Sequence, residues 1–255
     1  MLMDLCLSTA WYATCIVATH LAYEPMGSLI QRWYGQRYSE LRPKDKDYIC
    51  KNSIKGGMLA LATPMTIFVL MQRIIHSQWQ HIGLARAIGS LYAANDVVAL
   101  AKVPLPRNTQ IHHCCVALMS IVNLFIDYTN KSNIWTNMIM LCGLSMLSYI
   151  VNMYLGLRKI EESRVLAGAG LIAYVPTLAL NVGWQITHVA KALPSQPVSS
   201  LAYLAIVCSI FWDDSVLIRH LLKVVRTSMR TPSEEKKQSQ TRGHSQHSVV
   251  VVPTE

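Results

Sequence analysis

An aspartate and a pair of histidines lie on either side of a short turn between two apolar stretches. Asp96 lies near the end of the first stretch, and His112 and His113 open the second. The residues between them, Lys102–Arg107, include two prolines, which favour a tight turn. We therefore expect an antiparallel helical hairpin. A histidine oriented by a carboxylate is the usual arrangement for general-base or nucleophilic acyl chemistry.

The depth of these groups follows from the helical rise of about 1.5 Å per residue. Asp96 precedes Lys102 by six residues, or about 9 Å of helix. His112 follows Arg107 by five residues, or about 7.5 Å. The carboxylate and the imidazole are thus expected at nearly the same depth. Adjacent helical residues point in different directions, so only one histidine can face Asp96, and depth favours His112.

A third helix is expected to add polar groups to this layer. Asn152 precedes Arg158 by six residues, with Tyr149 one turn away, and Tyr92 lies one turn before Asp96. Ionisable groups inside a membrane are costly and usually face a cavity or a partner. The layer predicts either a site for a lipid headgroup or acyl group, or groups that satisfy one another and fix helix packing. Spacing alone favours neither.

Two adjacent carboxylates form a further candidate site. Asp213 and Asp214 lie in the last apolar stretch, and Asp213 precedes Lys223 by ten residues, or about 15 Å of helix. Both cannot remain unpaired anions there, so one is expected to be protonated or to meet a histidine or arginine. We favour acids that line a cavity over a proton or cation path.

Other kinds of site find little support. The seven cysteines include no CxxC pair and fit small buried hydrophobic residues. Cys114 and Cys115 follow His112 and His113 directly, but neighbouring helical residues diverge by about 100°, so the four cannot close around one ion. The chain has no P-loop, GxSxG or HExxH motif. We expect neither a metal nor a cofactor.

The elements that must carry these residues have the composition of membrane helices. Hydrophobic residues make up 52% of the 255 residues and charged residues 15%, against about 25% charged in soluble domains. A helix needs about 20 apolar residues to cross a bilayer. We mark seven such segments, at 5–23, 57–75, 82–101, 109–127, 134–157, 165–190 and 201–223. This composition excludes a secreted disulfide scaffold, a disordered protein and an ordinary soluble enzyme.

The basic residues predict the orientation. Of the 23 Lys and Arg residues, 19 fall in alternate connections and the C-terminal stretch, including Lys51 and Lys55 in the first loop, and 4 fall in the others. The positive-inside rule then places the N-terminus outside or in the lumen and the C-terminus in the cytosol. The net charge of +9 therefore indicates membrane orientation and no nucleic acid. We expect a transmembrane domain at 1–226 and a disordered cytosolic tail at 227–255.

Several segments carry a resemblance to a known family. They are Leu91–Asp96, Ile111–His113, Ser39–Asp47 with Asn52, and Ser148–Asn152 with Arg158. In this order they resemble the core, the lead-in and the fifth-helix region of the TLC-domain family, over about residues 39–225. The family comprises multi-spanning membrane proteins, mostly of the endoplasmic reticulum, and includes ceramide synthases and the translocating-chain-associated membrane protein.

The resemblance implies a fold and a lipid context. By position, Asp96, His112 and His113 match the family's polar centre. Ceramide synthases continue past the histidine pair with a longer signature that ends in His-Asp and a further Asp. The corresponding region here, Met138–Asn152, has no acidic residue and no histidine. The resemblance therefore favours a role in membrane lipid handling over ceramide synthesis.

We expect an all-α, TLC-like integral membrane bundle of about seven transmembrane helices that handles or senses membrane lipid in the endoplasmic reticulum. The candidate catalytic residues are His112, His113 and Asp96. The candidate lipid-binding residues are Tyr92, Tyr149, Asn152, Asp213 and Asp214. Two alternatives stay open: a ceramide-synthase-like N-acyltransferase that uses acyl-CoA, and a non-catalytic chaperone or cargo-interaction protein. Whether the chain is an enzyme, and whether it forms a homo-oligomer, is left open.

Overall fold

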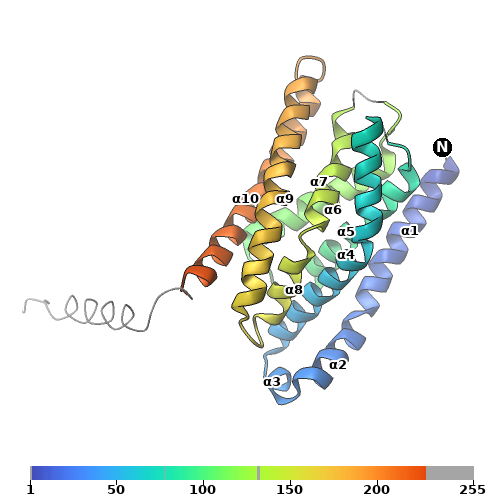
Figure 1. The fold of residues 1–255 in the computed structure, drawn as a ribbon. Helices are drawn as coiled ribbons and strands as arrows, with labels where there is room; N and C mark the ends of the chain where they lie inside the picture. The colour runs from blue at the N-terminus through green and yellow to red at the C-terminus, as the bar shows by residue number, and fades with distance from the viewer. Residues whose placement is uncertain (1, 78, 131–132, 228–255) are drawn as a thin grey trace, which may run out of the picture.

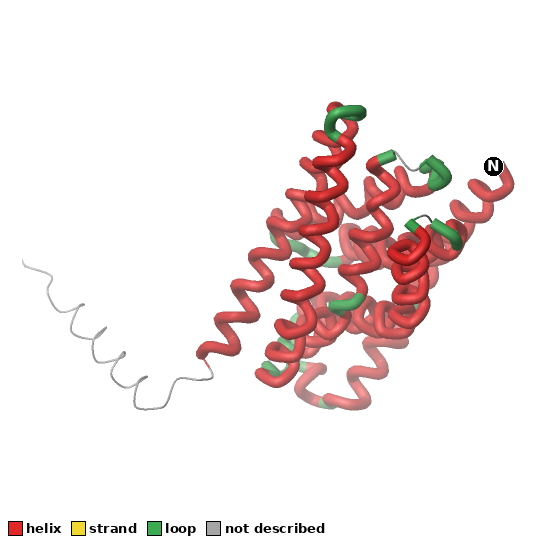
Figure 2. The backbone as a smooth tube through the Cα atoms, turned by 45° about the horizontal axis from the view of Figure 1, so that its top comes forward, coloured by secondary structure: helices red, strands yellow, loops and turns green. Residues whose placement is uncertain are grey.

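The structure is a computed structural model that describes residues 2–77, 79–130 and 133–227. Within these ranges the regular structure is entirely helical and includes no strand (Figure 2). The helices lie alongside one another in a bundle, with α1 at one edge and α9 and α10 at the other (Figure 1). The predicted all-α class is confirmed. The expected tail falls almost wholly outside the described residues.

The described ranges form ten α-helices and one 3-10 helix. They are α1 (Leu2–Leu21), α2 (Tyr23–Tyr34), α3 (Gln36–Ser39), α4 (Pro43–His76), α5 (Ile82–Lys102), α6 (Arg107–Phe125), η1 (Ile134–Asn137), α7 (Met138–Met146), α8 (Tyr149–Leu157), α9 (Arg164–Ala192) and α10 (Pro197–Thr227). Each of the seven apolar segments expected from the sequence lies mainly within these helices.

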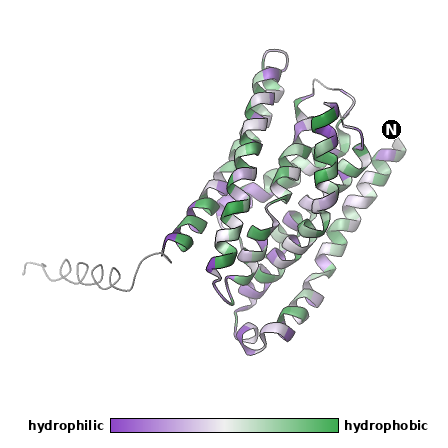
Figure 3. Cartoon of the chain, viewed as in Figure 1, coloured by the Kyte–Doolittle hydropathy of each residue, from purple (hydrophilic) through white to green (hydrophobic). Residues whose placement is uncertain are grey.

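Four helical stretches in the described ranges are long and apolar enough to cross a membrane. They are Met3–Tyr34, α4, α9 and α10. A fifth span results if Ile134–Met146 and Tyr149–Leu157, which bend by 53°, cross together. Hydrophobic residues recur along these helices, among more polar ones (Figure 3), and large apolar side chains such as Leu61 and Ile172 face outwards. Four to five such helices are compatible with a multi-pass membrane protein.

Helix α5 has a central position in the bundle. It packs against α1, α4, α6 and α7, and small buried residues such as Ala85, Ala93 and Ala94 let those neighbours approach closely. Because the neighbours shield α5, it can carry buried polar groups such as Asp96. The expected hairpin of α5 and α6 is present, joined by residues 103–106.

Helix α4 begins well before the apolar segment expected at 57–75. Pro43 starts it at a position where a missing backbone N–H costs nothing. The placement of Lys51 and Lys55 in a loop, which rested on their charge, is therefore wrong. Both lie inside α4 and are only 6% exposed. The amino-terminal half of α4 packs against α8 and α2, which explains its burial.

The fifth expected segment, 134–157, is not one continuous helix. Leu147 and Ser148 form a turn between α7 and α8, and the axis bends there by 53°. The Ser148 hydroxyl hydrogen-bonds the Thr177 hydroxyl of α9 at 2.7 Å. A serine at such a break is a common cause of a kink, because its side chain offers a polar partner outside the helix.

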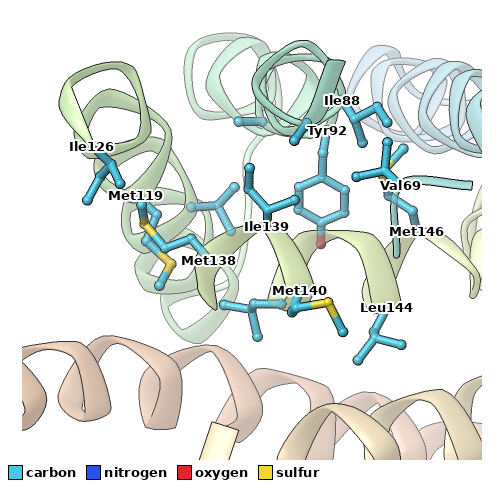
Figure 4. Close-up of a cluster of buried hydrophobic side chains, with 14 of the residues drawn as sticks. Val69, Ile88, Tyr92, Met119, Ile126, Met138, Ile139, Met140, Leu144 and Met146 are labelled. Carbon is cyan, nitrogen blue, oxygen red and sulfur yellow. The ribbon is translucent and has the colours of Figure 1, made fainter. Parts of the chain in front are cut away.

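The main apolar core surrounds α7. Figure 4 shows Met138 of α7 beside Met119 of α6 and the Tyr92 ring beside Ile139, while Met140 points to the opposite side of α7, near Leu144. A second buried cluster joins α2, α4 and the end of α5, and a third joins α8, α9 and α10. The polar cavity described next is lined by members of all three clusters.

Candidate functional site

One face of α4 carries a polar stripe into the bundle. Lys51 and Asn52 each lie three or four residues from both Tyr48 and Lys55, so the four residues share one side of the helix. Asn52 is 1% exposed. Burying two ammonium groups is costly unless they find partners. The stripe therefore needs compensating groups on the helices that it faces.

Asp96 supplies the first of these groups. Its side chain is fully buried, and Oδ1 lies 2.6 Å from Lys55 Nζ and 2.8 Å from His113 Nδ1. The other ring nitrogen, His113 Nε2, lies 3.2 Å from Lys51 Nζ. Because an ammonium group can only donate, Nε2 is the acceptor and the neutral ring carries its hydrogen on Nδ1, on the Asp96 side. Three helices thus form a chain of Lys51, His113, Asp96 and Lys55.

The histidine that faces Asp96 differs from the one expected. Depth favoured His112, but the structure places His113 against Asp96 and turns His112 toward α10. Counting residues fixes a position along a helix axis and leaves the direction of the side chain open. The two residues are one position apart, which is about 100° around the axis.

His112 meets a second carboxylate. Its Nδ1 lies 3.4 Å from Asp213 Oδ2. The other Asp213 oxygen, Oδ1, accepts a hydrogen bond from the Thr109 hydroxyl at 3.1 Å and one from the Asn108 side chain. The partner that Asp213 was expected to need is therefore His112. Neutral donors from the first turn of α6 hold this carboxylate in place.

Asp214 and Tyr92 complete the interior of the site. Asp214 is 8% exposed and interacts with the Tyr174 side chain of α9. The Lys55 ammonium lies 4.5 Å from the centre of the Tyr92 ring, a distance at which the ring face attracts a cation. Lys55 is therefore held by a carboxylate and by an aromatic ring.

A second basic cluster lies at the carboxyl end of α8. Arg158 Nη1 donates to His220 Nε2 at 2.6 Å, and Arg158 Nη2 donates to the Tyr48 hydroxyl at 3.1 Å. The Tyr154 hydroxyl also lies 3.3 Å from His220 Nε2. Among the described residues, no carboxylate forms an ion pair with Arg158. Within the described ranges the guanidinium therefore has neutral partners only.

These groups surround a cavity of about 440 Å³. Cations, carboxylates and imidazoles from α4, α6, α10 and the carboxyl end of α8 face it, and one side is apolar. The polar lining includes Lys51, Lys55, Arg158, His112, His113, Asp213, Asp214, Asn52 and Asn152. The apolar lining includes Leu105, Val151, Leu155, Val216 and Leu217. A polar hollow with one apolar side can hold a small polar group attached to a hydrocarbon chain.

Most of the candidate residues expected from the sequence meet at this cavity. Tyr92, Asn152, Asp213 and Asp214 line it together with both histidines, and Asp96 lies directly behind Lys55 and His113. Tyr149 does not line it, because the break before α8 directs this residue to the main apolar core.

The two carboxylates of α10 were not expected to share a site with Asp96. Their depth was counted from Lys223 along an axis assumed to stand upright in the membrane. Helix α10 is inclined to the rest of the bundle (Figure 1), so residue counting overestimates how far Asp213 lies from the end of the bundle.

Sequence reasoning missed the basic residues of the site. Lys51 and Lys55 served only to predict topology, although the spacing of Tyr48, Lys51 and Lys55 fits one helical face. Had the helix been extended back to Pro43, this spacing would have revealed the stripe. Arg158 was used to count the depth of Asn152 and in the family resemblance, and not as a residue of the site.

In the part of the chain that the structure describes, no group of three or more His, Cys, Asp or Glu residues could hold a metal ion. Comparison of the chain with protein-family models, with curated proteins and with solved structures found no match.

Proposed function

We propose that this chain is a membrane protein of TLC type with seven spans that binds a membrane lipid, whose polar head enters the cavity. The resemblance of residues 39–225 to the TLC-domain family supports this reading, and so does the α5–α6 hairpin at the centre of the bundle. An endoplasmic reticulum location, with the N-terminus in the lumen and the C-terminus in the cytosol, belongs to the same proposal.

The observation that carries the proposal is the lack of an acidic partner for Lys51. Within the described ranges Lys55 pairs with Asp96, whereas Lys51 contacts only the neutral ring of His113. Arg158 likewise has neutral partners. A buried cation without a counterion is unfavourable. A phosphate or carbonyl oxygen of a bound lipid would supply the missing partner.

The size of the cavity limits what it holds. Small-molecule sites usually measure about 300–1,000 Å³, so about 440 Å³ accommodates a headgroup and the start of a chain. The remaining hydrocarbon would leave beside Leu155, Val216 and Leu217, which form the apolar side. The tails of the lipid would then stay in contact with the membrane.

The test is the amount of lipid that purifies with the protein. Mass spectrometry should show several-fold less bound lipid in Lys51→Met and in His112→Ala than in the wild type. Lys44→Met is the matched control, because Lys44 lies on the same helix but is exposed outside the cavity. Unchanged lipid content in both cavity variants would contradict the proposal.

A second candidate function is N-acyl transfer from acyl-CoA to a long-chain amine. The contact of His112 Nδ1 with Asp213 at 3.4 Å favours it, because a carboxylate that orients a cavity histidine creates a general base. The amine nitrogen would attack the thioester carbonyl carbon as His112 removes its proton. The C–S bond would then break, and the coenzyme A thiol would leave with a proton.

This candidate has its own assay. Membranes that contain the protein would be supplied with acyl-CoA and a long-chain base, and the amide product measured. We expect His112→Ala and Asp213→Asn to abolish turnover, and Lys44→Met to leave it intact. Turnover that survives the loss of both His112 and His113 would rule out this mechanism. It would not bear on the proposal that the cavity binds a lipid.

A further inference from the structure

A second basic site lies at the opposite end of the bundle. Arg73 follows Lys55 by 18 residues on α4, which corresponds to about 27 Å of helix. Arg73 lines a groove between the carboxyl halves of α4 and α9, beside η1. This groove shares no residue with the cavity of the proposed lipid site.

Two indole rings hold the Arg73 guanidinium. Its Cζ atom lies 5.6 Å from the centre of the Trp79 ring and 5.9 Å from the centre of the Trp184 ring. The Trp184 indole is itself fixed, because Nε1 donates to Asn137 Oδ1 at 3.1 Å and the ring stacks on His188 at 4.3 Å. The guanidinium is thus positioned before any ligand arrives.

The groove has positive charge without a counterion. Arg73, His188 and Lys191 line it, and no aspartate or glutamate is found among its described lining residues. In the same ranges Arg73 forms no ion pair, and its buried Nε has no hydrogen-bond partner. A guanidinium matches the oxygens of a phosphate particularly well, because its donors form a planar fork.

The rest of the groove is apolar. Ile74, Pro176, Ala179 and Leu180 line it along α4 and α9, and Leu180 is 65% exposed. These helices are long and apolar enough to cross a membrane, so this surface would face hydrocarbon. Basic groups near the helix ends with an apolar strip beside them match the shape of a phospholipid.

We infer that this groove binds one phospholipid with an anionic headgroup. Its phosphate would lie against Arg73, with His188 and Lys191 at the rim, and one acyl chain would run along Pro176 and Leu180. The competing explanation is that the Arg73 side chain only extends to the membrane–water interface and binds no particular lipid. That explanation predicts no preference between anionic and zwitterionic lipids.

The experiment measures lipid selectivity in nanodiscs that contain equal amounts of phosphatidylglycerol and phosphatidylcholine. Native mass spectrometry should detect retained phosphatidylglycerol in excess on the wild type. Arg73→Gln should weaken this retention about tenfold, as expected for the loss of a charge-assisted contact. Arg219→Gln is the matched control, because Arg219 also lies near a tryptophan, 6.0 Å from the Trp212 ring, but hydrogen-bonds Ser215.

Three outcomes would overturn the inference. They are equal retention of the two lipids by the wild type, unchanged retention in Arg73→Gln, and an equal loss in Arg219→Gln. Glycerol 3-phosphate provides a further arm, since binding of this soluble headgroup as tight as that of the lipid would exclude a role for the acyl chain. Lys191→Gln, at an exposed position, should lower retention in part and covers the case in which Arg73→Gln fails to fold.

Discussion

The ion pair of Lys55 and Asp96 shows how this bundle can bury charged residues. The carboxylate is fully buried and contacts both an ammonium group and an imidazole through Oδ1. The ammonium group also lies over the Tyr92 ring. Asp96 Oδ2 has no hydrogen-bond partner among the described residues. The arrangement depends on the cation and the anion being present together, because each compensates the desolvation of the other.

The first prediction follows from this dependence. Asp96→Asn should lower the free energy of unfolding by about 3–5 kcal/mol, because it leaves a buried ammonium group without its counterion. Lys55→Met should be similarly harmful, because in the described part of the chain it leaves the carboxylate with His113 alone at ion-pair distance. Both effects can be measured by denaturant titration in mixed micelles.

The control is an exposed ion pair of the same type. Arg37 and Glu161 lie 3.6 Å apart, with side chains 70% and 66% exposed. Glu161→Gln should change stability by less than about 1 kcal/mol, because water screens this pair. The double variant Lys55→Met with Asp96→Asn should cost less than the two single losses added together. Simple additivity would show that the two residues do not act as a pair.

The residue scale also shows what a sequence can reveal about the site. Counting from the turn correctly grouped Asp96 with the histidine pair, since both lie near the same end of a hairpin. It could not decide between His112 and His113, because that choice depends on how α6 is rotated against α5 and α10. The rotation of α6 about its axis is set by packing against residues that are distant in the sequence, so the residues of α6 alone do not reveal it.

At the scale of elements, close approach between α4 and α8 positions the polar stripe. Gly156 of α8 faces Ser53 and Ile49 of α4. A Cβ atom there would lie 2.9 Å from Ser53 Oγ and 3.3 Å from the Ser53 backbone nitrogen. Only a residue without a side chain allows this approach. The same contact keeps Arg158, two residues later, within reach of Tyr48.

The second prediction compares two helical glycines. Gly156→Ala should lower the free energy of unfolding by about 1–3 kcal/mol, because the added methyl group forces α8 away from α4. Gly168→Ala in α9 should raise it by about 0.5–1 kcal/mol, since nothing lies within 4 Å of its new Cβ and alanine favours a helix. Destabilisation of equal size in both variants would contradict the packing argument.

Elements were easier to predict than their ends. The apolar segments expected from the sequence lie mainly within helices, because hydrophobicity is a local property. Four to five of these helices are long and apolar enough to cross a membrane in the described ranges. The amino-terminal extension of α4 was missed, because its lysines were taken to be solvated in a loop. The break at Ser148 was missed as well, since it depends on the partner Thr177 on another helix.

At the scale of the whole molecule, two basic sites lie at opposite ends of the same helices. Helix α4 contributes Lys55 to one site and Arg73 to the other, and α9 contributes Tyr174 and Trp184. On α4, the 18 residues from Lys55 to Arg73 correspond to about 27 Å of helix, which approaches the thickness of a hydrocarbon core. Together, the two proposals have the protein contact lipid headgroups in both leaflets, with α4 contributing a basic residue to each site.

The third prediction concerns how many helices cross the membrane. If α5 and α6 span with the others, the turn at 103–106 lies on the cytosolic side and the turn between α9 and α10 lies on the opposite side. Cysteines introduced at the exposed residues Arg107 and Ser195, in a chain without native cysteines, report this directly. In sealed microsomes, a membrane-impermeant maleimide should label Arg107→Cys from outside and Ser195→Cys only after the membrane is opened. If α5 and α6 do not cross, the two turns lie on the same, lumenal side, and neither cysteine should be labelled before opening; the cavity would then lie between five spans and a re-entrant hairpin.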